Sequence, residues 1–360
     1  MNDRDDLNPE SKSSELESGS EQNANAAFFW LRSKRTWFLV LLILVLVPYG
    51  YTRIRSVTRM VQSFSDTNFA RNENSAGNEI KLLVYNIAHG RGLAKSNWSE
   101  GPFEKKKRVI KIAEFIRNLD FDIAILNEVD FHCTWTGHMN QAKMIANLTG
   151  TSNRVQQRNL DFGFVYGAFD FGNAMLSKIP VKNSSCVEYP PYRIWESWLA
   201  GHKKGLFAEL DWPDDSSQKV QLVAVHLEHR DEESRIKAIR KIFSTVGDGP
   251  AILAGDFNST PEGFPGHRKS RFDENSINLI VESDRWKTFQ PMSPGESVFT
   301  FPSDNPNRTI DWVFVSHHFE MLEYQVLDSQ LSDHLPVLVR LRLKDEKPDA
   351  VTAGNENRTH

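Results

Sequence analysis

Two polar side chains that could do acid–base or metal chemistry, Asp256 and Asn258, lie in the stretch 250–261, PAILAGDFNSTP. The apolar run 251–254 before them predicts a short buried strand that ends at a glycine. Because residues i and i+2 of an extended backbone point to the same side, Asp256 and Asn258 can face one cleft, with Phe257 turned into the core. Ligands of α/β proteins bind at the carboxyl ends of such strands. The alternative is an Asx-type turn, in which both side chains bond only to their own backbone.

Similar polar residues accompany the other apolar runs of the chain. Those at the ends of runs are Asn86, Glu128, His226, Asp333 and His334, whereas Asp311 lies inside its run. A buried carboxylate is unfavourable unless it is paired, and a histidine is its natural partner. Each residue taken singly could cap a turn. Together they indicate metal and acid–base chemistry on a phosphate ester, which needs charge neutralisation at the phosphoryl oxygens, a positioned water and help for the leaving oxygen.

The elements that must position these residues alternate between strand and helix. Apolar runs predict strands at 80–85, 121–126, 171–177, 181–187, 206–210, 220–225, 251–254, 310–315 and 335–343. Apolar residues at helical spacing predict helices at 102–119, 138–148 and 231–246. This alternation is typical of an α/β fold.

An aromatic and basic stretch, EYPPYRIWESWLAGHKK at 188–204, follows the predicted strand 181–187. A loop of this length can form a rim or lid near a substrate. Aromatic loops also cover the edge of a core without any role in binding, and the sequence leaves both interpretations open.

The composition of the 360 residues supports a well-packed core, because 39% are hydrophobic and 25% are charged. The net charge of −4 gives no strong global field for nucleic acid, although a local basic groove remains compatible with it. Two cysteines, Cys133 and Cys186, do not make a disulfide framework. We expect both to be buried small hydrophobic side chains.

The amino-terminal region contains an uncharged apolar run at 37–51, WFLVLLILVLVPYGY, with basic residues on both sides. It is shorter than the roughly 20 residues that usually span a bilayer, so the core of a signal peptide is an alternative. No small-x-small cleavage site follows it, and we therefore predict a single-pass membrane anchor. The short tail before it favours a catalytic domain outside the cytoplasm. The predicted organisation is a disordered tail (1–35), a transmembrane anchor (36–52), a linker (53–78), a globular domain (79–345) and a second disordered tail (346–360).

Six short motifs resemble the endonuclease/exonuclease/phosphatase superfamily, which includes pancreatic-type deoxyribonucleases, abasic-site endonucleases, neutral sphingomyelinases and inositol polyphosphate 5-phosphatases. They are YNIAHG at 85–90, LNEVD at 126–130, VHLEHR at 225–230, GDFNSTP at 255–261, IDWVF at 310–314 and SDHLPV at 332–337. They follow the family order, and the resemblance covers roughly residues 80 to 343.

The resemblance implies a four-layer α/β sandwich, with two mixed sheets face to face, helices outside, and a Mg²⁺ or Mn²⁺ site at one end. Glu128 would be the main metal ligand, with Asn86 and Asp333 close by. Two positions depart from the family pattern. Ala88 stands where abasic-site endonucleases carry a second carboxylate, and Asn127 stands where a glutamine is usual.

The resemblance also implies catalytic roles. His334, oriented by Asp311, would act as a general base or as a phosphate-stabilising imidazolium. Asp256 would hold the attacking water, and Asn258 would donate a hydrogen bond to a phosphoryl oxygen. His226 would stabilise the transition state and could act as the acid. Family members differ in how they divide the roles of His334 and Asp256.

The function expected from these features is that of a membrane-anchored, metal-dependent phosphoesterase that acts on a phosphodiester. DNA, RNA and phospholipids are all candidate substrates, and a monomer is expected. The alternative is a catalytically silent, membrane-tethered binding module of the same fold. An inactive relative is expected to have lost one of the residues Glu128, His226, Asp256 or His334, and all four are present.

Overall fold

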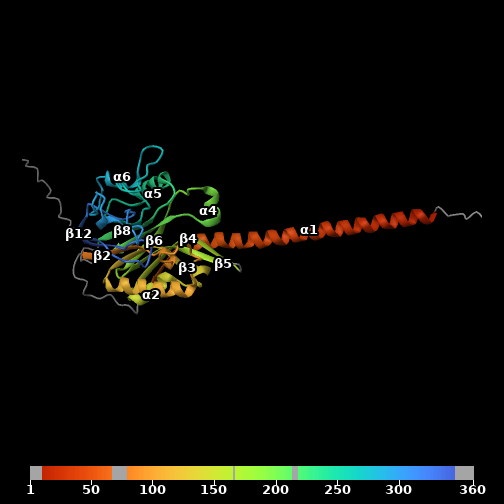
Figure 1. The fold of residues 1–360 in the computed structure, drawn as a ribbon, viewed down its shortest axis with the longest axis horizontal. Helices are drawn as coiled ribbons and strands as arrows, with labels where there is room; N and C mark the ends of the chain where they lie inside the picture. The colour runs from red at the N-terminus through yellow and green to blue at the C-terminus, as the bar shows by residue number, and fades with distance from the viewer. Residues whose placement is uncertain (1–9, 67–78, 165–166, 213–217, 345–360) are drawn as a thin grey trace, which may run out of the picture. The chain divides into compact units, whose positions relative to one another are not determined.

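The computed structural model describes residues 10–66, 79–164, 167–212 and 218–344. The chain separates into two compact units, residues 1–54 and residues 55–360 (Figure 1).

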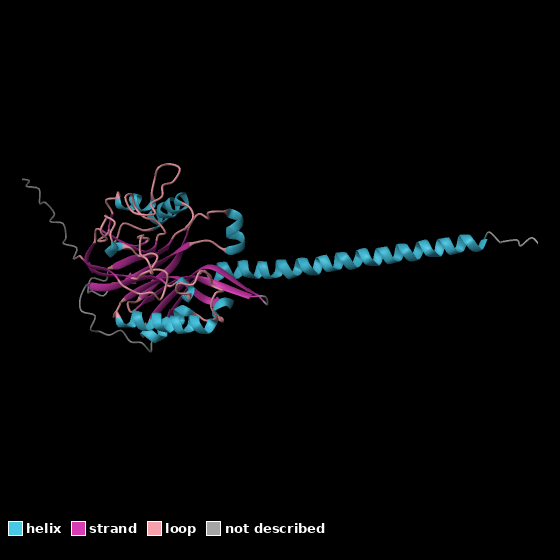
Figure 2. Ribbon diagram, in the orientation of Figure 1, coloured by secondary structure: helices cyan, strands magenta, loops and turns pink. Residues whose placement is uncertain are grey.

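The second unit contains two mixed β-sheets with helices on their outer faces (Figure 2). The seven-stranded sheet has the order β1 (Val61–Ser65), β4 (Asn153–Phe164), β5 (Gly167–Ser177), β3 (Ile123–Cys133), β2 (Glu79–Asn86), β13 (Val337–Leu343) and β12 (Phe319–Val326). The six-stranded sheet has the order β10 (Trp286–Lys287), β11 (Asp311–Ser316), β9 (Ala251–Asp256), β8 (Lys219–His226), β7 (Lys204–Asp211) and β6 (Val181–Glu188). The α-helices of this unit are α2 (Pro102–Asn118), α3 (Gln141–Thr149), α4 (Ile194–Ala200), α5 (Glu232–Thr245) and α6 (Ser276–Val281).

Three hydrophobic cores separate the four layers. The central core lies between the sheets and joins residues such as Val84 of β2 and Ala254 of β9. A second core packs α2 and α3 onto the seven-stranded sheet, for example through Ile112. A third packs α5 and α6 onto the six-stranded sheet, for example through Ile239. Strands that bury side chains on both faces need continuous apolar runs, which is why the sequence of β9 is apolar throughout up to Gly255. The predicted four-layer α/β sandwich is confirmed.

The described part of the amino-terminal unit, residues 10–54, lies within the helix α1 (Glu10–Thr58), which continues into the second unit. Its segment Ser33–Thr58 is long and apolar enough to cross a membrane, by length and composition. We expected residues 1–35 to be disordered, but the helix begins at Glu10. A helix that has nucleated in the apolar segment gains one hydrogen bond for each residue added, so it extends into the polar sequence. Residues 1–9 and the predicted tail at 346–360 lie outside the described residues.

The predicted linker at 53–78 is structured over its first part. The strand β1 pairs antiparallel with β4, so that Phe64 lies opposite Arg154. Upstream of β1, Arg55 and Arg59 form ion pairs of 2.8 and 3.3 Å with the buried carboxylate of Asp161. The buried carboxylate of Asp161 in β4 needs positively charged partners, which Arg55 and Arg59 supply. Without β1, the strand β4 would be an edge strand with unpaired backbone groups, and these favour the pairing with β1. Residues 67–78 lie outside the described part.

Gly255 allows β9 to approach β8 closely just before Asp256. Its φ is +145°, and a Cβ at this position would lie 1.9 Å from the backbone oxygen of Val225. We therefore expect Gly255→Ala to lower the free energy of unfolding by roughly 2 to 5 kcal/mol, through strain and overpacking. Urea unfolding followed by tryptophan fluorescence measures the change.

The matched control is Gly101→Ala, because a Cβ at Gly101 would meet nothing within 4 Å. Equal stability of the Gly255→Ala and Gly101→Ala variants would contradict the close approach of β8 and β9.

Candidate active site

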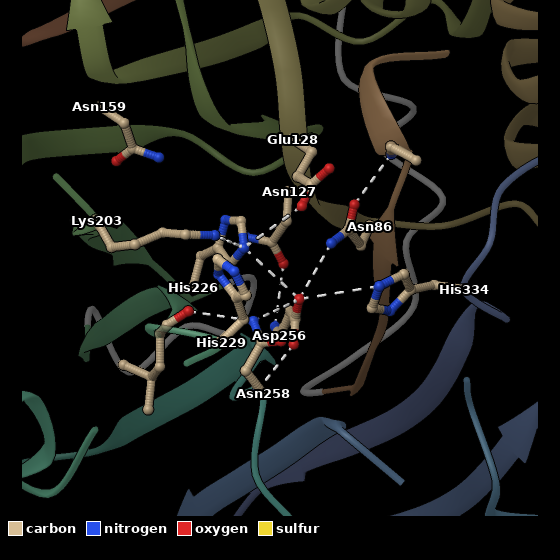
Figure 3. A network of polar contacts seen from close by, with 12 residues as sticks. Asn86, Asn127, Glu128, Asn159, Lys203, His226, His229, Asp256, Asn258 and His334 are labelled. Atoms are coloured by element: carbon tan, nitrogen blue, oxygen red, sulfur yellow. Dashed lines mark hydrogen bonds and ion pairs between the residues drawn. The ribbon is translucent and has the colours of Figure 1, made fainter. Parts of the chain in front are cut away.

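The predicted site residues come together at one end of the sandwich, where β2, β8 and β9 end and β11 begins. A cavity of about 510 Å³ opens there. Its lining includes five of the predicted residues: Glu128, Asp256, Asn258, Asp333 and His334. The polar network around Asp256 is shown in Figure 3.

Strand register places two partners beside Asp256. In the antiparallel pair of β9 and β11, Asp256 lies opposite Asp311. In the parallel pair of β8 and β9, it lies beside His226. The prediction that Asp311 needs a histidine partner is consistent with the geometry, because its Oδ2 lies 2.9 Å from Nδ1 of His334.

Asp256 is the centre of the network (Figure 3). Its Oδ2 accepts hydrogen bonds from Nδ2 of Asn86 at 3.1 Å and Nδ2 of Asn258 at 3.0 Å. The ring nitrogens Nε2 of His226 and His334 lie 3.6 and 4.0 Å from the same oxygen. Burial raises the pKa of Asp256 to about 7, although the positive charge of His334 opposes this shift. Near neutral pH this carboxyl group can therefore both accept and release a proton.

His334 is charged at neutral pH. Burial disfavours the imidazolium, but the carboxylates of Asp311 and Asp256 outweigh this effect and raise the pKa of His334 to about 10. The opposite holds for His226, because burial and the ammonium of Lys203 keep its pKa well below the usual range. The site thus contains one cationic and one neutral imidazole on either side of Asp256.

The apolar run 121–126 suggested that Glu128 lies just past the end of a strand. In the structure the strand β3 continues to Cys133, so Glu128 lies inside it. The pairing of β3 with β5 shifts register between Leu126 and Val129, and Glu128 has a φ of +53°. This β-bulge redirects the side chain at the rim of the sheet. Burial would raise the pKa of Glu128, but the electrostatic influence of His89, Lys203 and Arg91 keeps it well below the usual value.

The carboxylates of Glu128 and Asp333 share one cationic partner. The guanidinium of Arg91 donates hydrogen bonds to Glu128 at 3.1 Å and to Asp333 at 2.6 Å. Two carboxylates that converge on one cation offer the oxygen ligands that Mg²⁺ and Mn²⁺ prefer, so this pair fits the predicted metal site. Asn86 is turned away from the pair, since its Oδ1 accepts from the backbone of Ala88 and its amide donates to Asp256.

A second group of residues also fits a metal ion. One ligand atom from each of Asp256, Asp311 and His334 lies within 4.8 Å of the others. The sequence pattern did not suggest this group as a metal site.

Asn258 satisfies both interpretations of its motif. Its backbone N–H donates to Oδ1 of Asp256 at 2.8 Å, as in an Asx turn, and its side chain lines the cavity. Both amide protons are engaged, one by Asp256 and one by the backbone oxygen of Leu227. Phe257, which lies between Asp256 and Asn258 in the sequence, is buried, as expected from the alternation of side chains along an extended chain.

Besides Arg91, two further residues of the site were not assigned a role from the sequence. Asn127 accepts a hydrogen bond from the backbone N–H of Asp256 and donates to the backbone oxygen of Val225, both at 3.1 Å. Lys203 contacts Nε2 of His226 from the end of the aromatic and basic stretch 188–204. The hypothesis that this stretch forms a rim near the substrate could have indicated Lys203. For Asn127 the sequence showed only that it replaces the glutamine that is usual in the family.

Comparisons with known proteins agree with this architecture. The sequence profile of the Endonuclease/Exonuclease/phosphatase family matches residues 83–334. No functionally curated protein matches the chain.

Solved structures share the fold at low sequence identity. An endonuclease/exonuclease/phosphatase from Beutenbergia cavernae has a TM-score of 0.56 at 19% identity, over 74% of this chain and 72% of that one. The human Nocturnin catalytic domain with bound sulfate has a TM-score of 0.54 at 16% identity, over 79% and 98%. A mannosyl-6-phosphatase from Bacteroides thetaiotaomicron has a TM-score of 0.53 at 17% identity, over 73% and 99%. At these identities the structural likeness shows the fold alone, but the profile match covers most of the chain, which therefore belongs to the Endonuclease/Exonuclease/phosphatase family.

Proposed function

We propose that this protein is a membrane-anchored, metal-dependent phosphoesterase that hydrolyses a phosphodiester by attack of water at phosphorus. The observation that carries the proposal is one cavity lined by His334 and Asp256 and by the carboxylate pair of Glu128 and Asp333. Behind the lining, the buried Asp311 holds Nδ1 of His334 at 2.9 Å. The segment Ser33–Thr58 would anchor the chain in the membrane.

Asp256 is the proposed general base. A pKa of about 7 suits a group that takes a proton from water near neutral pH, and the hydrogen bonds from Asn86 and Asn258 fix its carboxylate. The hydrogen bond between Asp311 and Nδ1 of His334 holds the imidazolium so that its Nε2 lies 4.0 Å from Oδ2 of Asp256. A water molecule held by Asp256 would therefore lie next to a positive charge.

His334 is the proposed stabiliser of negative charge on the phosphoryl group. Its Nδ1 donates to Asp311, and its Nε2 remains as a second donor within 4.0 Å of Asp256. A preorganised cation in an enclosed site stabilises a charge that develops in the transition state. His226, neutral and in contact with Lys203, would orient that ammonium towards the phosphoryl group rather than act as an acid.

Glu128 and Asp333 are the proposed metal ligands. Asn86, which the resemblance implies would help to bind the metal, instead donates to Asp256. A bound Mg²⁺ or Mn²⁺ would polarise the phosphoryl oxygens. An ion bound by these carboxylates would compete with Arg91, which donates to both of them, and the guanidinium would then be a candidate donor to a phosphate oxygen.

Metal removal tests the proposal directly. We expect hydrolysis of bis-p-nitrophenyl phosphate by the full chain with Mg²⁺, and loss of that activity in EDTA. Glu128→Gln should lower kcat/KM by roughly 100-fold or more, because the neutral amide binds a divalent cation poorly. Release of p-nitrophenolate is followed at 405 nm, roughly the absorption maximum of that product.

The control is Glu114→Gln on α2, an exposed position away from the cavity, which should keep the wild-type rate. Equal rates in EDTA and in Mg²⁺ would rule out the metal mechanism. Inactivity towards DNA, RNA and phospholipids as well would favour the silent binding module.

The pKa of His334 tests its role as a cation. Asp311→Asn removes the carboxylate that raises this pKa, so we expect the pKa to fall from about 10 towards its ordinary value of 6.5. NMR titration of the imidazole in metal-free protein measures the shift, and Asp304→Asn, at an exposed position, is the control.

The same shift predicts how stability depends on pH. The pKa of the folded state lies above the ordinary value, so protonation of His334 stabilises the fold fully below about pH 6.5, and this contribution is lost as the pH rises towards 10. An imidazole that titrates near 6.5 in the wild-type protein would contradict the proposed cation.

A further inference from the structure

The arginines that line the cavity fall into two groups. Arg91 and Arg235 are engaged by carboxylates, Arg91 by Glu128 and Asp333 and Arg235 by Glu232 at 2.5 Å. Arg268 and Arg308 line the same cavity, and within the described part of the chain no carboxylate lies within ion-pair distance of either guanidinium.

Arg308 is held in place although it lacks an acidic partner. Its guanidinium lies 4.8 Å from the ring centroid of Phe301, and that ring lies 4.9 Å from the imidazole of His334. On the other side, Gly266 leaves room for the stem of Arg308, because a Cβ at Gly266 would lie 2.7 Å from Cδ of Arg308. The ring of Phe301 therefore lies between the guanidinium of Arg308 and the imidazolium of His334, the proposed catalytic cation.

Two polar atoms on the same wall of the cavity also lack partners. Oγ1 of Thr260 and Nε2 of His267 are buried and form no hydrogen bond with any described residue. Nδ1 of His267 donates to the backbone oxygen of Thr260 at 3.1 Å, which fixes the two residues against each other. Buried polar groups are nearly always hydrogen-bonded, so the unpaired hydroxyl of Thr260 at the cavity points to a ligand that accepts its hydrogen bond.

We propose that Arg268 and Arg308, with the hydroxyl of Thr260, form a second phosphate-binding subsite, so that the substrate carries a further phosphate besides the scissile one. The inference rests on the proposed function for the position of the scissile group, which is bound at Asp256 and His334. It narrows the substrate class from any phosphodiester to one with a second phosphate.

The chemistry of the subsite selects a phosphate. Guanidinium groups bind phosphate oxygens through paired hydrogen bonds, and a hydroxyl adds a further donor. A choline headgroup carries a positive charge and would be repelled by the two arginines, so sphingomyelin and phosphatidylcholine are disfavoured. The second phosphate could belong to a nucleotide or to a phosphorylated inositol ring, since both present the same dianion.

Two matched substrate pairs distinguish these sources. The first is thymidine 5′-(p-nitrophenyl phosphate) with and without a 3′-phosphate, and the second is dioctanoyl phosphatidylinositol with and without a 4-phosphate. We expect the full-length enzyme to prefer the doubly phosphorylated member of at least one pair by about 10- to 100-fold in kcat/KM. The pair that shows the preference identifies the source.

The variant that tests the subsite is the double substitution Arg268→Gln and Arg308→Gln. It should reduce the preference ratio to near one, and because the ratio is taken within each variant, changes in folding or in general activity cancel. The matched control is Arg271→Gln in the same loop, whose guanidinium is already paired with Glu233 at 3.0 Å, and its ratio should stay at the wild-type value.

A binding measurement separates the subsite from the proposed function. Calorimetry with thymidine 3′,5′-bisphosphate and with inositol 1,4-bisphosphate requires no turnover, and the double variant should bind the preferred ligand about 10- to 100-fold more weakly than the wild type. Loss of all hydrolysis with this binding difference retained would overturn the catalytic proposal alone. Equal ratios for both substrate pairs in the wild type, or equal binding by wild type and double variant, would overturn the subsite.

Discussion

The side chain of Asn127 joins the two sheets at the point where the site forms, and the arrangement of the site depends on it. It lies in β3 of one sheet and forms hydrogen bonds with Val225 and Asp256 of the other. Its remaining amide proton is donated to Asn173 at 2.9 Å, so every polar group of this buried side chain is used. The site is therefore a product of sheet-on-sheet packing, and no single strand carries it.

Opposite charges alternate through the rest of the site. His334 lies between Asp311 and Asp256, and Arg91 lies between Glu128 and Asp333. Buried ion pairs add little net stability, because desolvation offsets much of their attraction. Their value here is that each charged group has its position fixed before a substrate arrives, which is the condition for electrostatic catalysis.

The sequence predicted the parts of the structure that depend on local pattern. Apolar runs with a polar residue at the end, such as the one before Asp256, located strands and site residues together. It did not predict β4, whose sequence NRVQQRNLDFGF is too polar to indicate a strand, nor the bulge that turns Glu128. The roles of Arg91 and Lys203 were also missed, because both depend on contacts between residues far apart in the chain.

The pairing of β9 with β11 fixes the catalytic residues, whereas the connection between these strands carries the residues that select the substrate. Evolution can therefore change the substrate and keep the reaction. Asp256 and Asp311 face each other because the strands are paired residue by residue, and a slip of one residue would send either side chain to the opposite face of the sheet. The connection between them, residues 257–310, includes α6 and β10 and contributes Arg268 and Arg308 to the cavity. Substitutions at Arg268 and Arg308 alone would alter the preferred substrate, whereas Asp256, Asp311 and Asn258 would keep their places in the reaction.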